Sequence, residues 1–354
     1  MDFAGVKVFE SETVDTNILL FEKAKNKHKT ICAVISKENK DSIKNLRVLV
    51  QQQHSVSSFD KGGESWVNLN EIEQSIKRKI EAVGTPLKDW DIQIKNGIST
   101  GFNEAFIIST EKRDEILSNC KNEEERKKTA ELIRPILRGR DIKRYSYDWA
   151  NLWLVYIPWH FPLHLDNSIH GCSEKAEKEF QKQYPAIYNH LLGYKKQLSA
   201  RNKAGICYEW YALQRWGANC WEDFFKPKIM YAEIVQEPKF YLDKKNFLPE
   251  ATSFLLTGEN LEYLVKVFNS KITAYLFKTF YAGGGFGESS FRYKKAFFEN
   301  LPIPRIDKQQ IQSVEKSNND EEISIQLGKI YGFSPTEIYF IARKVDELNE
   351  EDKR

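Results

Sequence analysis

Three clusters of basic side chains carry the chemistry that this sequence displays most clearly. In the first, a single acid, Asp141, lies among five bases, which are Arg134, Arg138, Arg140, Lys143 and Arg144. Arginine offers a planar group with several donors, which matches both phosphate oxygens and the edge of guanine. Such clusters are typical of a DNA-binding surface, and for each one alone the alternative is a solvated face. The second cluster is Lys195, Lys196, Arg201 and Lys203, and the third is Arg292, Lys294 and Lys295.

Aromatic residues and glycines adjoin the second and third clusters. The third cluster includes Tyr293 and directly follows the glycine-rich stretch 283–287. A glycine loop lets the backbone approach a ligand closely, and basic residues beside it suit contact with phosphate or nucleic acid. A connector between two elements is the alternative for this loop. The aromatic residues beside the second cluster are Tyr208, Trp210, Tyr211, Trp216 and Trp221.

The same glycine stretch does not fit the two common nucleotide-binding motifs. It follows a helical pattern and not a strand, and Glu288 occupies the place of the last glycine in a dinucleotide fingerprint. No Gly-Lys-Ser/Thr follows it, so a P-loop is excluded as well. The sequence therefore offers no nucleotide cofactor site at this loop.

Four potential zinc ligands lie close together in the middle of the chain. An i, i+4 pair of histidines on a helix could bind zinc. Pro162, however, lies between the first two histidines and interrupts the helix that would align them. We therefore expect polar and aromatic packing around Trp159 and Phe161, and no metal site. The four residues are His160, His164, His170 and Cys172.

A metal-dependent nuclease site could be assembled from Asp223, Glu237 and Lys239. Two carboxylates and a lysine are what metal-assisted cleavage of a phosphodiester requires. Pro238 inside this triplet fits a turn better than an active-site strand. A Gly-x-Ser-x-Gly elbow is absent, and no cysteine has a convincing histidine partner, so covalent catalysis has no candidate and we expect no catalytic residue.

Composition places the chain among soluble globular proteins and leaves its partner to be judged from the distribution of charge. Of the 354 residues, 41% are hydrophobic and 29% charged, which excludes a disordered tail and predicts about two domains. The net charge is only +3, but the part from Asp307 onward holds 11 acids and 7 bases. The rest of the chain is therefore basic, as a DNA-binding protein would be, and the tail is acidic.

Cysteine usage and hydropathy indicate a protein of the reducing cytoplasm. The five cysteines are an odd number without a C-x-x-C pair, which argues against a disulfide framework and a structural zinc site. No uncharged apolar run approaches the roughly 18 residues that a membrane span needs, and the N-terminus has no signal pattern. We expect a cytoplasmic protein without membrane contact.

The elements that must position the basic clusters predict an α+β fold. Apolar residues recur every three or four positions over 69–83, with Asn68 or Asn70 as N-cap and Gly84 beyond the end. A β-meander is predicted over 224–254, and one helical face over 261–279, ended by Gly283. The other expected elements are strands within 1–20, 31–35, 46–50 and 152–157, β and turn over 87–108, and helices over 121–136, 174–184 and 185–200.

Several ordered stretches together resemble the TaqI-like C-terminal specificity domain of type IIG restriction-modification enzymes, a domain that is attached to adenine-specific DNA methyltransferases. Phe9–Thr16 resembles the closing strands of the methyltransferase domain in that family, and Gly97–Phe106 resembles the loop that opens the recognition region. The resemblance covers nearly the whole chain, and its specificity lies in the joint order of the motifs. The other matching stretches are Ile133–Ile142, Tyr184–Ile187 with Arg201, Phe225–Ile229, Phe268–Lys271, the aromatic-glycine loop, Phe291–Lys295 and Leu301–Pro304.

The chain departs from this family in lacking its catalytic motifs. A glycine-rich cofactor loop and an Asn-Pro-Pro-Tyr type motif belong to the methyltransferase half, and neither occurs in the sequence. The resemblance therefore implies a recognition half, either truncated or separately encoded. It also assigns S-adenosylmethionine, and the magnesium of any nuclease, to the half that is absent.

The resemblance implies three regions and a mixed β-sheet recognition domain with packed helices. Residues 1–85 would be the closing strands of a methyltransferase-like domain with a connecting helix, 86–306 the specificity domain, and 307–354 an acidic helical tail. Leu301–Pro304 would pack back onto the domain as an extended segment.

An enzyme that methylates a base must flip it from the stack, and needs a second surface to hold and read the duplex. Basic residues would set position on the phosphates, while loops around 214–216 and 283–292 would read base edges. The predicted DNA-binding residues are Arg138, Arg140, Lys143, Arg144, Arg201, Gln214, Arg215, Trp216, Gly284, Gly285, Arg292, Tyr293, Lys294 and Lys295.

The function predicted from the sequence is thus sequence-specific recognition of double-stranded DNA, next to a methyltransferase or endonuclease part. Two alternatives stay open: the metal-dependent nuclease described above, and a module that binds proteins of a restriction-modification complex. Duplex affinity that falls steeply between about 50 and 200 mM salt distinguishes DNA recognition from protein binding. Nicking of plasmid that depends on Asp223 would indicate the nuclease.

Overall fold

A computed structural model describes the chain in two compact units. Unit 1 comprises Met1–Trp90, Ile234–Glu237 and Ser270–Arg354, and unit 2 comprises Asp91–Glu233 and Pro238–Asn269. The structure describes all residues except 2, 4–7, 9–15, 26, 28, 36–43, 58–68, 202–204, 283–290 and 352–354. Nearly all of the motif at 9–16, and Gly284 and Gly285 with the rest of their loop, lie outside the described residues. The predicted regions 1–85, 86–306 and 307–354 stay predictions.

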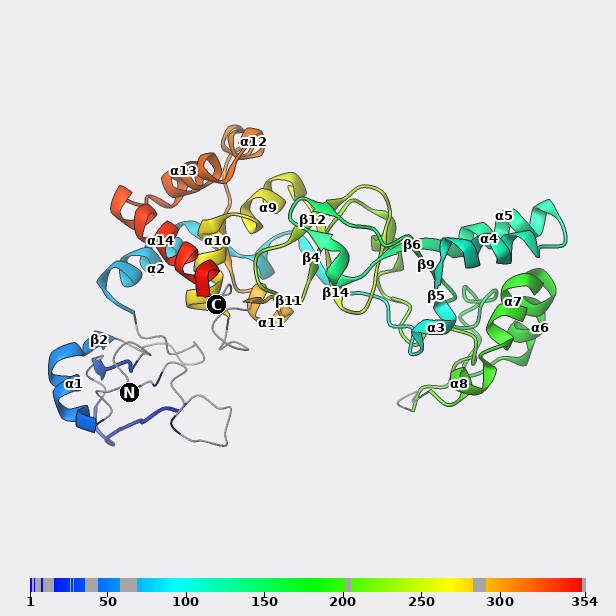
Figure 1. Ribbon diagram of the computed structural model, residues 1–354, viewed down its shortest axis with the longest axis horizontal. Helices are drawn as coiled ribbons and strands as arrows, with labels where there is room; N and C mark the ends of the chain where they lie inside the picture. Colours follow the sequence, from blue (N-terminus) through cyan, green and yellow to red (C-terminus); the bar gives the residue numbers. More distant parts are fainter. Residues whose placement is uncertain are drawn as a thin grey trace. The chain divides into compact units, whose positions relative to one another are not determined.

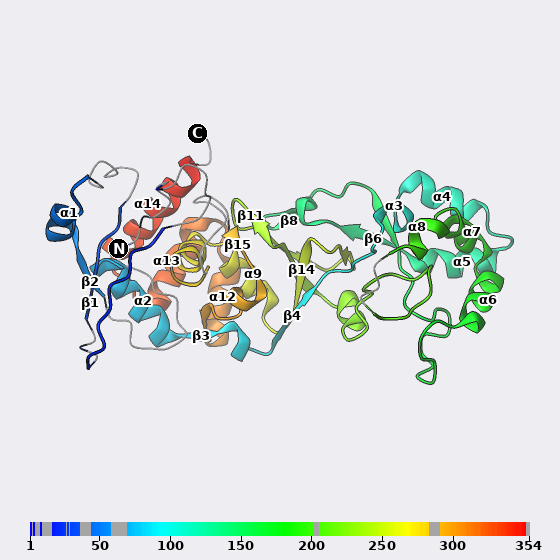
Figure 2. The same cartoon turned by 90° about the horizontal axis from the view of Figure 1, so that it is seen from below.

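A four-stranded antiparallel sheet forms one half of unit 2. Its central strand, β10 (Lys228–Ala232), is buried at all five positions. β10 is an inner strand that pairs on both sides, so that Ile229 faces Leu242 on one neighbour and Leu256 on the other. Figure 2 shows β14 beside β4 at this sheet. The sheet order is β12 (Phe240–Asp243), β10, β14 (Ser253–Gly258) and β4 (Ile92–Asn96), and α9 (Leu261–Phe268) packs on β12.

The strands predicted between 224 and 254 are confirmed, but their order as a meander is wrong. In a meander β12 would pair with β14, whereas both pair with β10. The segment between β12 and β14 instead leaves this sheet as β13 (Leu248–Pro249) and pairs in parallel with β6 (Ile133–Leu137) of a second sheet. The chain between β12 and β14 therefore belongs in part to the second sheet, and β12 is an edge strand of the first.

The other helices of unit 2 pack with the second sheet. Its order is β13, β6, β9 (Leu152–Val155) and β5 (Ile107–Ser109). A helix was expected over 121–136, but it ends at Leu132 and β6 follows directly. Pro135 and two isoleucines favour an extended chain at that point. The helices are α3 (Asn103–Phe106), α4 (Thr110–Ser118), α5 (Glu123–Leu132), α6 (Glu174–Gln183), α7 (Pro185–Leu192) and α8 (Lys195–Ser199), of which α4 and α5 lie side by side in Figure 1.

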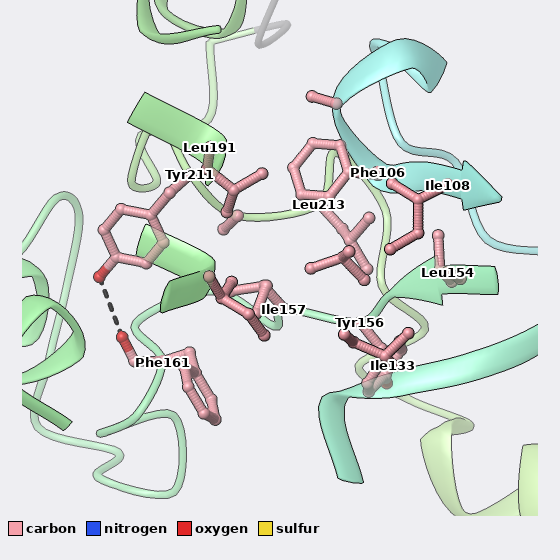
Figure 3. Packing of buried hydrophobic residues seen from close by; sticks show 14 of the residues in the cluster. Phe106, Ile108, Ile133, Leu154, Tyr156, Ile157, Phe161, Leu191, Tyr211 and Leu213 are labelled. Atoms are coloured by element: carbon pink, nitrogen blue, oxygen red, sulfur yellow. Dashed lines mark hydrogen bonds between the residues drawn. The ribbon is translucent and has the colours of Figure 1, made fainter. Parts of the chain in front are cut away.

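The core of unit 2 lies between the second sheet, these helices and the irregular segment around residues 208–213. Figure 3 shows Phe106, Ile133, Ile157 and Leu213 converging there, and all four are almost fully buried. The hydroxyl of Tyr211 donates to the carbonyl oxygen of Phe161 at 2.9 Å within the same core. Burial of this apolar set is the main source of stability of unit 2. Its shorter elements are the 3₁₀ turns Gly139–Asp141 and Trp221–Phe225, and β7 (Ile142–Lys143) and β8 (Ser146–Tyr147).

Unit 1 joins segments from both parts of the chain. The helix predicted over 69–83 is confirmed as α2 (Glu71–Val83), and Asn70 caps it in a capping box with Glu73. Two expectations are wrong. Residues 46–53 form α1 (Leu46–Gln53) and not a strand, because Asn45 caps a helix there. The helix expected over 261–279 is divided at Asn269 and Ser270, and Ser270 caps α10 (Lys271–Leu276).

In the described part of unit 1, three pairs of short strands and four further α-helices accompany α1, α2 and α10. The extended segment expected at 301–304 is confirmed, since β16 (Pro302–Pro304) pairs with β3 (Gly84–Pro86). The other pairs are β1 (Thr30–Cys32) with β2 (Ser55–Ser57), and β11 (Ile234–Val235) with β15 (Phe291–Arg292). The remaining helical elements are the 3₁₀ turn Leu87–Asp89, the π-helical turn Phe277–Tyr281, α11 (Lys295–Phe298), α12 (Lys308–Lys316), α13 (Asp320–Tyr331) and α14 (Pro335–Glu351).

The mixture of helices and sheets, without regular alternation, confirms the predicted α+β class. No helix among the described residues is long and apolar enough to cross a membrane.

A buried carboxylate at the start of α14 should make unit 1 sensitive to acid. Glu337 accepts hydrogen bonds from Lys79 Nζ at 2.6 Å, from Ser75 Oγ at 2.7 Å and from the backbone N–H of Ser334 at 2.6 Å. Burial alone would raise the pKa of Glu337, but these donors outweigh it and lower the pKa to about 2. The ionised form is therefore stabilised only in the folded state.

We expect the stability that Glu337 supplies to be present at neutral pH and to disappear as the pH falls from about 4.5 towards 2. Linkage of this size corresponds to about 3 kcal/mol in the free energy of unfolding. Glu337→Gln should lose most of that stability at pH 7, and the difference from the wild type should close in acid. Urea denaturation followed between pH 7 and 2.5 measures this, and a pH-independent difference would contradict it.

Candidate nucleic-acid interface

The segment from Tyr208 to Trp216 is anchored in unit 2 by its backbone and by its own apolar side chains. Tyr208, Tyr211 and Leu213 are at most 1% exposed. Leu213 also accepts from Trp159 Nε1 at 2.7 Å through its carbonyl oxygen, and its N–H donates to the carbonyl oxygen of Ile157 at 2.9 Å. The segment is thus buried from Tyr208 to Leu213, and the residues after Leu213 emerge from a fixed point.

The end of this segment presents three predicted DNA-binding residues. The backbone of Arg215 pairs in both directions with Ser99, at 2.9 and 3.0 Å, while its side chain is exposed. Gln214 is half-buried, and its Oε1 accepts from Ser99 Oγ at 3.3 Å. Trp216 packs against the core, and its carbonyl oxygen accepts from the hydroxyl of Tyr156 at 2.9 Å. Among the described residues, the guanidinium of Arg215 has no side-chain partner, so it is available to an anion.

Arg201, in contrast, is committed to the protein. Its guanidinium donates to the carbonyl oxygens of Thr100 at 2.6 Å and of Trp210 at 2.6 Å. It also donates to those of Ala212 at 2.9 Å and Leu198 at 3.0 Å. Burial lowers the pKa of Arg201. With these donors engaged, the prediction that Arg201 contacts DNA has no support from its placement, and we leave it out of the proposed surface.

In the first basic cluster, residues 138–144 form a tight turn, and its basic side chains have different surroundings. Arg138 makes a bidentate pair with Asp141, at 2.8 and 2.7 Å, which fixes the turn. Lys143 lies 3.5 Å from Asp148, and Arg144 donates to the carbonyl oxygen of Asn269 at 2.7 Å. Arg140 is exposed, and no described residue is a partner of its side chain. Of this cluster, Arg140 is best placed to contact phosphate.

A common frame connects this turn to the segment that presents Arg215. The N–H of Gly139 donates to Thr252 Oγ1 at 3.0 Å, and the N–H of Glu250 donates to the carbonyl oxygen of Leu137 at 3.0 Å. Ile98 in turn donates to the carbonyl oxygen of Pro249 at 2.8 Å, one residue before the Ser99–Arg215 pairing. The turn of the first cluster and the segment that presents Arg215 are therefore both connected to residues 249–253, the latter through the strip 97–100. No basic residue marks these segments, which is why their role was not predicted.

Close backbone approach explains the glycine at the start of this strip. A Cβ added to Gly97 would lie 2.1 Å from the carbonyl oxygen of Glu250. Only glycine allows the two segments to meet this way. The signal in the sequence was the pair Gly97 and Gly101, which marked a turn but not the segments that it connects.

The third cluster belongs to unit 1 and divides in the same way as the first. Lys294 and Lys295 are exposed, and their side chains have no partner among the described residues. Arg292 is half-buried in β15. Tyr293 is 1% exposed and stacks on Phe277, with ring centroids 4.6 Å apart. Because the ring is buried in this way, a stacking contact with a base would require Tyr293 to leave the core.

The residues considered for metal chemistry have other partners. His160 Nδ1 lies 2.9 Å from Glu209 Oε1, and the ring of His164 stacks on Phe161. Cys172 Sγ lies 3.2 Å from the carbonyl oxygen of Tyr208. Asp223 pairs with Lys226 at 2.9 Å. Within the described part of the chain, no three His, Cys, Asp or Glu residues gather as a metal site would require.

Residues 134–303 match the family model of the TaqI-like C-terminal specificity domain, which confirms the resemblance inferred from the sequence over that range. The match includes the turn at Arg138–Arg144, the segment 208–216 and the third basic cluster. No curated protein matches the chain.

Two solved structures are similar over more of the chain. The type IIG restriction endonuclease BpuSI is 12% identical, with a TM-score of 0.47, and covers 80% of this chain and 33% of its own. The type IIL restriction-modification enzyme MmeI, in complex with DNA, is 9% identical, with a TM-score of 0.45, and covers 92% of this chain and 42% of its own. With both TM-scores below 0.5, the family match is the stronger finding. The chain spans less than half the length of either enzyme.

Proposed function

We propose that this chain, whose residues 134–303 match the TaqI-like C-terminal specificity domain, recognises double-stranded DNA for a restriction-modification enzyme. The match to a specificity domain is the observation that carries the proposal. In this role the chain holds and reads a duplex, while a catalytic part methylates adenine or cleaves the strand. S-adenosylmethionine and magnesium would belong to that catalytic part, and the complex would act on DNA in the cytoplasm.

The surroundings of the basic residues support this division of labour. Arg140, Arg215, Lys294 and Lys295 are exposed, and within the described part of the chain their side chains have no partners, so phosphate can bind them without breaking an ion pair. Gln214 and Arg215 stand at the end of a segment whose backbone is fixed on both sides. Glutamine and arginine are the side chains that read adenine and guanine edges in the major groove. A fixed backbone that presents the half-buried Gln214 and the exposed Arg215 suits base readout.

Binding should therefore depend strongly on salt. Each exposed cation that contacts phosphate should add about −1 to the slope of the logarithm of the association constant against the logarithm of salt concentration. Between about 50 and 200 mM salt, each such contact should lower the affinity by about three- to fourfold. Fluorescence anisotropy of a labelled duplex measures both quantities.

The same titration separates the two alternatives. Absence of duplex binding at low salt would overturn the proposal and favour a module that binds protein. Nicking of plasmid in magnesium or manganese that stops with Asp223→Ala would favour a nuclease. The pairing of Asp223 with Lys226 gives that second alternative no support.

A further inference from the structure

Arg201 joins parts of unit 2 that are distant in sequence. Its four acceptors are the carbonyl oxygens of Leu198, Thr100, Trp210 and Ala212. Thr100 belongs to the strip that pairs with Arg215, while Trp210 and Ala212 belong to the segment that ends in Gln214 and Arg215. One side chain thus binds both the strip 97–100 and the segment 208–216, next to the proposed base readers Gln214 and Arg215.

The surroundings of Arg201 are built for a guanidinium. The rings of Phe106 and Tyr208 lie 5.5 and 5.7 Å from its Cζ, so its faces meet aromatic rings while its edge meets carbonyls. Thr100 is 3% exposed, and a buried carbonyl without a donor is costly. A lysine keeps the charge, but it cannot reproduce a planar fork that reaches four acceptors.

Gly101 leaves room for this arrangement. Its φ is +74°, and an added Cβ would lie 2.9 Å from Arg201 Cδ and 3.0 Å from Gln214 Oε1. The same small volume therefore receives the stem of Arg201 and the amide of Gln214. A displacement of the Arg201 side chain should therefore change the position of the Gln214 side chain.

We propose that Arg201 is a positioning residue for sequence reading: by holding the carbonyl oxygens of Thr100, Trp210 and Ala212 it sets the orientation of Gln214 and Arg215, without itself contacting DNA. This inference rests on the proposed function and assigns to Arg201 a role in selectivity. The mechanism is preorganisation, because readers that are held in place do not have to be ordered when the duplex binds.

The test compares the wild type with Arg201→Lys in two measurements. In the first, each protein selects duplexes from a randomised library, and enrichment of the preferred motif over random sequence is counted. We expect Arg201→Lys to lower that enrichment at least about tenfold, as the loss of a base contact would. In the second, the salt dependence of binding to a random duplex is measured. We expect its slope to be unchanged, since a residue that contacts phosphate would reduce the slope by about one.

Arg113→Lys is the matched control. Arg113 lies in α4 of the same unit, where its guanidinium stacks on Trp153 at 4.2 Å, remote in sequence from the proposed readers. The substitution is identical and conserves charge, so it should leave the enrichment unchanged. Thermal unfolding of each protein is recorded, and selections are made well below the lowest melting temperature. Any loss of enrichment then reflects reading and not unfolding.

Three results would overturn the inference. A folded Arg201→Lys protein with wild-type enrichment would show that the hydrogen bonds of Arg201 do not position Gln214 and Arg215. A slope reduced by about one would show that Arg201 contacts phosphate directly. If Arg201→Lys does not fold, Gly101→Ala is used instead, because its Cβ presses on Arg201 and Gln214 at once. Failure of both variants to fold would make Arg201 a residue of stability alone.

Failure of the proposed function is distinguishable from failure of this inference. A wild-type protein that enriches no motif would overturn sequence recognition before any variant is compared. A wild-type protein that enriches a motif, beside an equally selective Arg201→Lys, would overturn only the role of Arg201.

Discussion

Replacing both Arg140 and Arg215 by alanine should weaken duplex binding about tenfold to a hundredfold at low salt. Both side chains are exposed, and no described residue is a partner of either, so on a duplex of random sequence, where Arg215 reads no base edge, each can release a counterion when it meets a phosphate. The loss of two such contacts should also reduce the magnitude of the salt slope by about two. Anisotropy titrations at several salt concentrations measure the affinity and the slope together.

The matched control removes the same charge from another part of unit 2. Lys112 is a half-buried lysine of α4 and Lys128 an exposed lysine of α5, and each pairs with a glutamate of its own helix, at 2.8 and 2.6 Å. The double variant Lys112→Ala, Lys128→Ala should keep nearly the wild-type slope. An equal loss in both double variants would mean that net charge alone binds DNA. A slope unchanged by Arg140→Ala and Arg215→Ala would remove both residues from the interface.

A second large effect is expected from the buried ion pair at the centre of unit 2. Lys228 Nζ lies 2.6 Å from Asp243 Oδ2, and both side chains are 0% exposed. Lys228 also donates to the carbonyl oxygen of Phe224 at 2.8 Å, while Asp243 accepts from the N–H groups of Lys245 and Phe247, both at 2.9 Å. Burial lowers the pKa of Lys228, and Asp243 opposes that shift. The pair thus ties β10 to the turn that follows β12.

Lys228→Met should destabilise unit 2 by about 3–5 kcal/mol, because it leaves the Asp243 carboxylate buried without its counterion. Methionine fills most of the lysine volume, so a cavity contributes little. Six of the eight tryptophans lie in unit 2, so urea denaturation followed by tryptophan fluorescence reports mainly on this unit. The expected result is a lower midpoint of that transition.

Lys226→Met is the control for this prediction. Lys226 lies two residues away, its side chain is 58% exposed, and its ion pair with Asp223 is on the surface. An ion pair of so exposed a lysine contributes little to stability, so this variant should be nearly as stable as the wild type. If Lys228→Met were equally harmless, the buried pair would not be a determinant of the fold.

The sequence predicted elements well where local signals decide them. The helix Glu71–Val83 has an apolar face at helical spacing and a capping box, which are both visible in the sequence. The run Leu46–Val50 predicts a strand, but so short an apolar run has no period that separates strand from helix. The decisive contact is the side chain of Asn45, which accepts from the N–H of Val48.

Long-range contacts account for the other structural errors. The helical face expected over 261–279 is interrupted because Asn269 forms two hydrogen bonds with the backbone of Phe240, at 3.0 and 2.8 Å. An asparagine inside an apolar pattern does not reveal such a partner. The parallel pairing of β13 with β6, which replaces the expected meander, joins residues more than a hundred positions apart in the chain.

The candidate interface was predictable in part for the same reason. Basic clusters can be counted in a sequence, and Arg140 and Arg215 are exposed as expected. Counting does not separate them from Arg201, whose donors are engaged by carbonyl oxygens, or from Tyr293, which is buried beside Phe277. Burial and hydrogen-bond partners depend on tertiary structure.

Selection of duplexes from a randomised library by the wild-type chain at low salt tests the central claim most directly. Sequencing of the bound fraction should show enrichment of one short motif, because Gln214 and Arg215 emerge from a fixed backbone and can reach base edges. Salt-sensitive binding without any enriched motif would contradict sequence recognition and leave the chain only a role in holding DNA.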